Sequence, residues 1–147
     1  TSPRERATAH MAIEALRDWS NAFAEVTYCN ANPNSELCEA GVHREGAECA
    51  SQTSPRFDRL RRDYLKSTLP EQLDMFARLL VQGGTSWVAG SDKPTHADFV
   101  LAETLDQNNI FASGGDEVTE AIGDYMPQTV EIGALLEFRA RFEALPP

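Results

Sequence analysis

The stretch from Leu69 to Ile110, LPEQLDMFARLLVQGGTSWVAGSDKPTHADFVLAETLDQNNI, carries the strongest local signals for the fold. Its first part has apolar residues at the three- and four-residue spacing of an amphipathic helix. These residues are Leu69, Leu73, Phe76 and Leu80. Gly83 and Gly84 follow, as glycines commonly do where a helix ends. We therefore predict one helix up to these glycines and then a turn through Trp87-Val88-Ala89-Gly90.

A second helix is predicted over residues 96–111. Thr95 and Asp98 have the spacing of a capping box at its start. In such a box we expect the Thr95 hydroxyl to accept from the amide of Asp98, and the Asp98 carboxylate to accept from the amide of Thr95. Asp98 also lies in the first turn, where the helix dipole favours negative charge. The early part of this helix is largely apolar, with Ala97, Phe99, Val100 and Leu101.

Helical spacing continues on both sides of this stretch. Residues 4–28 form one predicted helix, and residues 56–82 resume the pattern. Pro70 interrupts the latter, so it either begins a new helix or kinks this one. Residues 128–145 form a last predicted helix. The apolar stripes of the first and last helices are Ala12, Leu16, Trp19, Phe23 and Val26, and Leu135, Phe138, Phe142 and Leu145. Because no long strand-like alternation occurs, we predict one all-α domain over residues 1–147, a bundle of about five helices.

Charge and composition exclude several classes of partner. The net charge of −10 argues against nucleic acid, because phosphate binding needs clustered Lys and Arg. The basic cluster from Arg56 to Arg62 contains Asp58 and precedes Asp63, so we interpret it as a solvated helix face rather than an anion site. No apolar run approaches the roughly 20 residues that span a membrane. Three cysteines are an odd number, which favours a reducing, cytoplasmic compartment over a disulfide framework.

Residues 30–55 break the helical pattern. They are rich in Asn, Pro, Ser, Gly and Glu, so we predict a long, mobile surface loop. Cys38, His43 and Cys49 lie within it. Two thiols and one imidazole without a second short-spaced pair are too few to predict a metal site. A disulfide between Cys38 and Cys49 is the other alternative to a plain loop.

The sequence contains no self-contained active site. Its three histidines, His10, His43 and His96, lie in no recognisable nucleophile motif. It has no GxSxG, no HExxH, no phosphate-cradling glycine loop and no CxxC. The sequence alone therefore supplies no complete active site.

The pattern LPE-L--F---L------W-AG---T-ADF---E-LD resembles the C-terminal, all-helical domain of cytosolic glutathione S-transferases, closest to the mu and sigma classes. The similarity continues through Met126-Pro127 and the closing segment from Phe138 to Leu145. It implies that the helix after Thr95 is buried in the domain core and that residues 30–55 are an insertion. It also implies that a thioredoxin-like N-terminal domain activates the glutathione thiol. We expect that domain to be carried on another chain or removed, because these 147 residues show no sign of it.

The resemblance also assigns candidate site residues. Tyr28 matches the tyrosine whose hydroxyl assists the electrophile, and Asp18 matches the acidic residue that reaches the ammonium of glutathione across the dimer. Ten residues separate them, about 15 Å along a helix, so both can reach one ligand. Ala24 matches a position that lines the electrophile pocket, and Arg17 lies near another. Each of these two residues also has an interpretation without a functional role. Tyr28 would then be a residue at the end of an amphipathic helix, and Asp18 an exposed carboxylate beside Arg17.

Two main functions remain open at this point, and a small-molecule carrier that uses the residual pocket is a weaker third. The first is the helical half of a glutathione transferase, not catalytic alone, with glutathione as co-substrate, no resident cofactor, and a thioredoxin-like domain or homodimer partner. The second is a non-catalytic scaffold or interaction subunit of a larger assembly, in which residues 30–55 contact other protein subunits. The sequence does not determine whether the chain is part of an enzyme, nor which electrophile that enzyme would take. Without its partner, we expect the chain to expose apolar surface.

Overall fold

The computed structural model describes residues 2–27, 55–84, 86–113 and 132–146. Within these residues the chain is helical and contains no strand, which confirms the all-α prediction. The elements are α1 (Pro3–Thr27), α2 (Pro55–Asp63), the π-helical segment η1 (Tyr64–Thr68), α3 (Leu69–Gly83), α4 (His96–Ser113) and α5 (Ile132–Glu143). Apart from Pro55, the predicted loop over residues 30–55 lies outside the described part of the chain.

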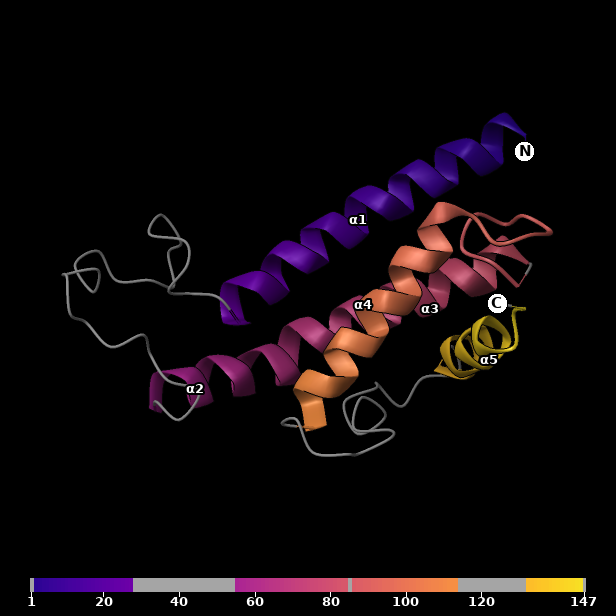
Figure 1. Ribbon diagram of the computed structural model, residues 1–147. Helices are drawn as coiled ribbons and strands as arrows, with labels where there is room; N and C mark the ends of the chain where they lie inside the picture. The colour runs from indigo at the N-terminus through magenta and orange to yellow at the C-terminus, as the bar shows by residue number, and fades with distance from the viewer. Residues whose placement is uncertain (1, 28–54, 85, 114–131, 147) are drawn as a thin grey trace.

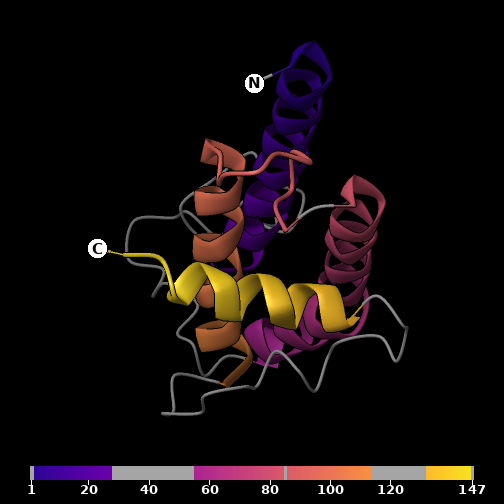
Figure 2. The ribbon, with the colours of Figure 1, turned by 90° about the vertical axis from the view of Figure 1, so that its right-hand side faces the viewer.

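Two helix pairs form most of the bundle. α1 packs against α4 and touches α2 and η1, while α5 packs against α3 (Figure 1). Figure 2 shows α5 crossing in front of α3 and α4 at a steep angle. Among the described residues, the fully buried aromatic side chains come from three helices: Trp19 of α1, Phe76 of α3 and Phe138 of α5. The rings of Trp19 and Phe76 stack with their centroids 5.7 Å apart, so α1 and α3 share one core.

A capping box begins α1, at the Thr1-Ser2-Pro3 start whose sequence predicts a cap and an early proline. The Ser2 amide donates to the Glu5 carboxylate at 2.7 Å, and the Glu5 amide donates to the Ser2 hydroxyl at 3.2 Å. The sequence signal was present, because Ser2-Pro3-Arg4-Glu5 has the spacing of the motif with proline at the first helical position.

The structure shows that a new helix begins next to Pro70, which is one of the two alternatives for this proline. α3 begins at Leu69 with Pro70 in its first turn, and the preceding turn widens into the π-helix η1. There the amide of Leu69 donates to the carbonyl of Tyr64, five residues back. Proline cannot donate to the carbonyl four residues back, and its ring would clash with it. A π turn shifts the hydrogen-bond register. This shift accommodates the proline, and α2, η1 and α3 follow one another without a break.

The two glycines end α3 as predicted. Gly84 has φ 62° and ψ 12°, and its amide donates to the carbonyl of Val81 at 3.1 Å. This left-handed conformation is the one that glycine adopts at a helix C-terminus without a steric penalty.

Phe99 departs from the expectation that α4 is buried. Ala97 and Leu101 are buried, but Phe99 is 52% exposed. Residues two apart lie on nearly opposite sides of a helix, so Phe99 cannot share the core-facing side of Ala97.

Arg61 is an exception to the solvated face predicted for the basic cluster. Its guanidinium donates to the carbonyl oxygens of Phe111 at 3.0 Å and Ala112 at 2.7 Å, near the C-terminal end of α4. It also lies 5.6 Å from the centre of the Phe111 ring. Cations stabilise the negative end of a helix dipole. Arg59 and Arg62 are exposed, as expected for the rest of the cluster.

We expect Arg61→Ala to lower the free energy of unfolding by about 1.5 kcal/mol, because charge-assisted hydrogen bonds to half-buried carbonyls are lost. Arg59→Ala, which removes an exposed arginine two residues earlier, should change it by no more than about 0.5 kcal/mol. Urea unfolding of both variants measures the difference. Equal values would mean that the Arg61 contacts add nothing to stability.

Candidate functional site on the first helix

Three of the four residues that the sequence singled out lie on α1. Arg17 and Asp18 are exposed, and Ala24 is half-buried. Seven residues separate Arg17 from Ala24, so the two lie about 20° apart around the helix and about 10 Å apart along it. Asp18 lies about 120° around the helix from Ala24. The helix thus presents Arg17 and Ala24 along one stripe and Asp18 in another direction. Tyr28 lies outside the described residues.

The Asp18 carboxylate has no hydrogen bond or ion pair with any other described residue. Its neighbour Arg17 turns instead to Glu14, with a guanidinium–carboxylate distance of 2.7 Å. Exposed ion pairs of this kind contribute little to stability, roughly 0.3–0.5 kcal/mol. The Asp18 carboxylate is therefore not used by the described part of the fold.

The residues that the structure describes contain no group of three potential metal ligands. His10 and His96 are exposed. The predicted loop residues Cys38, His43 and Cys49 lie outside the described ranges, so the disulfide and metal alternatives there remain untested.

Thr95 and Asp98 form the predicted box, with one difference. The Asp98 carboxylate accepts from the amide of Thr95 at 2.7 Å, as expected. The Thr95 hydroxyl, however, donates to the same carboxylate at 2.8 Å, and the Asp98 amide donates to the carbonyl of Thr95 at 3.0 Å. The second carboxylate oxygen accepts from the amide of Val88 at 2.8 Å. One buried carboxylate thus ties the start of α4 to the turn through Trp87 and Gly90.

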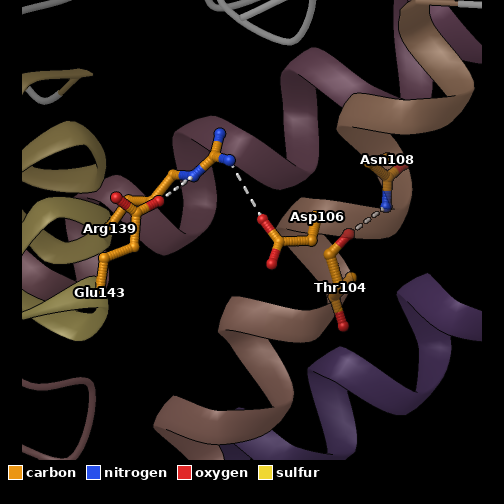
Figure 3. A network of polar contacts seen from close by, with 5 residues as sticks. All are labelled: Thr104, Asp106, Asn108, Arg139 and Glu143. Atoms are coloured by element: carbon orange, nitrogen blue, oxygen red, sulfur yellow. Dashed lines mark hydrogen bonds and ion pairs between the residues drawn. The ribbon is translucent and has the colours of Figure 1, made fainter. Parts of the chain in front are cut away.

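A second structural feature joins three elements through side chains. The Trp19 indole N–H donates to the Tyr64 hydroxyl at 2.7 Å, and this hydroxyl donates to the Asn108 amide oxygen at 2.6 Å. The Asn108 amide nitrogen donates to the carbonyl of Thr104 at 2.8 Å (Figure 3). Burial raises the pKa of Tyr64 to about 12, although both hydrogen bonds act in the opposite direction. All three side chains are buried and partnered, so we assign this chain to stability rather than to catalysis.

Comparison with known proteins identifies the family. The family model for the glutathione S-transferase, C-terminal domain, matches residues 42–147. The chain belongs to this family. The match contains α2 through α5, but it begins after Tyr28, so the assignments of Arg17, Asp18, Ala24 and Tyr28 remain predictions.

Several curated proteins of this glutathione S-transferase family are similar to the chain. It is 41% identical over 93 residues to "Glutathione S-transferase Mu 1" of Oryctolagus cuniculus, which covers 63% of this chain and 35% of that protein. It is 37% identical over 92 residues to "Glutathione S-transferase" of Mesocricetus auratus, covering 63% and 34%. The matched segment is therefore about a third of these relatives' length. No solved structure matches the chain. None of its described helices is long and apolar enough to cross a membrane.

Proposed function

We propose that this chain is the helical half of a glutathione transferase. In the reaction, the glutathione thiolate would attack a small electrophile. With an aryl chloride, a carbon–sulfur bond forms, the carbon–chlorine bond breaks, and chloride leaves with the bonding electrons. The observation that carries the proposal is the match of residues 42–147 to the family model of the glutathione S-transferase C-terminal domain, and the curated relatives are named glutathione S-transferases as well. The thiolate would be generated by a part of the transferase other than this chain.

α1 and Tyr28, the residue that follows it in the sequence, would supply the polar groups around the two substrates. Asp18 would pair with the ammonium of glutathione, because a carboxylate is the natural partner of that cation. Its exposure and its lack of a partner among the described residues support this role. Tyr28 would donate a hydrogen bond to negative charge that develops on the electrophile. Arg17 and Ala24 share a stripe that would form one wall of the electrophile site.

In the complete gene product, Asp18→Ala should raise KM for glutathione about tenfold with little change in kcat, because it removes ground-state binding. Tyr28→Phe should lower kcat about tenfold and leave that KM nearly unchanged. Glu25→Ala, an exposed carboxylate seven residues from Asp18, is the matched control and should change neither. Steady-state conjugation kinetics give all three results. An unchanged KM in Asp18→Ala would remove Asp18 from the glutathione site.

The same assay decides between the proposal and the scaffold alternative. A complete gene product that binds other subunits but conjugates no glutathione would be a non-catalytic member of the family.

A further inference from the structure

Trp19 fixes α1 in a way that the other buried residues of this helix do not. The buried residues of α1 are Ala12, Leu16, Trp19 and Val26. Three of them pack through apolar groups alone, and apolar packing has no preferred direction. The Trp19 indole N–H, in contrast, donates to the Tyr64 hydroxyl at 2.7 Å, and a hydrogen bond weakens steeply when its angle changes. This bond therefore favours one rotation and one axial position of α1 relative to η1.

The groups around this bond are themselves held in place. The Tyr64 hydroxyl donates to the Asn108 amide oxygen at 2.6 Å. The Asn108 amide nitrogen donates to the carbonyl of Thr104, one turn earlier in α4, at 2.8 Å (Figure 3). The Trp19 ring also stacks on Phe76 of α3, with the ring centroids 5.7 Å apart. Through one side chain, α1 is thus joined to α3 by ring stacking and to η1 and α4 by buried hydrogen bonds.

Asp18 lies directly before Trp19 in the sequence of α1. Consecutive Cα atoms are about 3.8 Å apart, so a contact that fixes the backbone at Trp19 also fixes it at Asp18. The Asp18 carboxylate is exposed and has no hydrogen bond or ion pair with any other described residue, so the helix that carries it sets its position. A group at the rim of a helix about 10–12 Å wide moves by about 2 Å when the helix turns by about 20°. Such a shift is enough to break a charge-assisted hydrogen bond.

We propose that Tyr64 is a positioning residue for glutathione: through Trp19, it holds α1 in the rotation that presents Asp18 to the glutathione ammonium. This inference rests on the proposed function, since it takes Asp18 as the partner of that cation. Tyr64 would touch neither substrate, because its hydroxyl is already paired with Trp19 and Asn108 inside the bundle. Its effect on glutathione would therefore depend entirely on the Asp18 carboxylate.

Titration calorimetry of the complete gene product with glutathione, without an electrophile, tests this dependence. We expect Tyr64→Phe to raise Kd for glutathione about threefold, and Trp19→Phe, which removes the donor of the same bond, to do likewise. In the Asp18→Ala background, the same two substitutions should change Kd by less than about 1.5-fold, because the group that they position is gone. The fitted stoichiometry reports the folded fraction of each variant. If Tyr64→Phe does not fold, Trp19→Phe decides, since it leaves the bond from Tyr64 to Asn108 in place.

Asp98→Asn is the matched control for a general loss of stability. It weakens polar contacts at the start of α4 that involve no residue of α1, so Kd should change by less than about 1.5-fold. An unchanged Kd in Tyr64→Phe and Trp19→Phe would overturn the proposal. A rise of the same size in the Asp18→Ala background, or in Asp98→Asn, would also overturn it.

The conjugation rate of the unsubstituted protein separates this inference from the proposed function. Conjugation together with an unchanged Kd in Tyr64→Phe and Trp19→Phe refutes only the positioning role. A rise in Kd that depends on Asp18, without conjugation, refutes only the transferase function. A protein that neither binds nor conjugates glutathione refutes both.

Discussion

Replacing Asp98 with alanine is expected to lower the free energy of unfolding by about 3–5 kcal/mol. The substitution removes a buried carboxylate that accepts from the Val88 amide, the Thr95 amide and the Thr95 hydroxyl. Val88 is fully buried, so its amide is left without a partner and without water. A buried donor that loses its partner costs about 1–3 kcal/mol, and loss of an N-terminal cap adds about 1 kcal/mol.

Urea unfolding of the Asp98→Ala variant measures this effect. Asp106→Ala is the matched control on the same helix: its side chain is 60% exposed and its ion pair with Arg139 is worth at most about 1 kcal/mol. Asp98→Asn keeps the size of the side chain, but it places an amide N–H against one of the N–H donors, so it should also destabilise. A loss below about 1 kcal/mol in Asp98→Ala would show that the box does not hold the turn to α4.

Tyr64→Phe is expected to lower the free energy of unfolding by about 2–4 kcal/mol. The ring is kept, so packing against Phe23 and Phe111 changes little. What is lost is the hydroxyl that accepts from Trp19 and donates to Asn108. Both of those groups are buried, so leaving each of them unpaired costs about 1–3 kcal/mol of stability. A loss under about 0.5 kcal/mol would mean that water replaces the hydroxyl.

The same tyrosine makes the free energy of unfolding fall as the pH rises above about 10. Burial raises its pKa from 10.0 to about 12 in the folded chain. Below pH 10 the phenol is protonated in both the folded and the unfolded chain, so its titration does not change the free energy of unfolding. Between pH 10 and 12 the unfolded chain loses this proton first, so stability falls, by about 2–3 kcal/mol in total. Tyr64→Phe should lack this part of the decline, and urea unfolding at pH 9 and 11 compares the two proteins.

The helices could be predicted because their signals are local. The spacing of Leu69, Leu73, Phe76 and Leu80 and the glycines after them depend only on neighbouring residues, and the structure confirms both. Thr95 and Asp98 were likewise predicted as a pair from a three-residue spacing, although the direction of the hydroxyl bond was not.

Contacts between distant residues could not be predicted in this way. Arg61 reaches carbonyls 50 and 51 residues away, and Trp19 reaches Tyr64 across 45 residues. No local pattern in the sequence indicates which helices will be neighbours. The exposure of Phe99 could have been anticipated, since its position relative to Ala97 follows from helical geometry alone.

The candidate site was predictable only in part. Exposure of Asp18 follows from its place opposite the apolar stripe of α1, and the structure agrees. The roles of Asp18, Arg17 and Ala24 do not follow from α1 itself, because a transferase site also needs the group that activates the thiol. That group is not among the described residues, and Tyr28 is not either.

The most direct test of the proposed transferase function is the rate at which the complete gene product conjugates glutathione to a chlorodinitrobenzene. We expect a saturable rate above that of the uncatalysed reaction, with a KM for glutathione that rises when Asp18 is replaced by alanine. A complete gene product whose rate equals the uncatalysed rate would contradict the central claim and leave a glutathione S-transferase domain that acts as a scaffold.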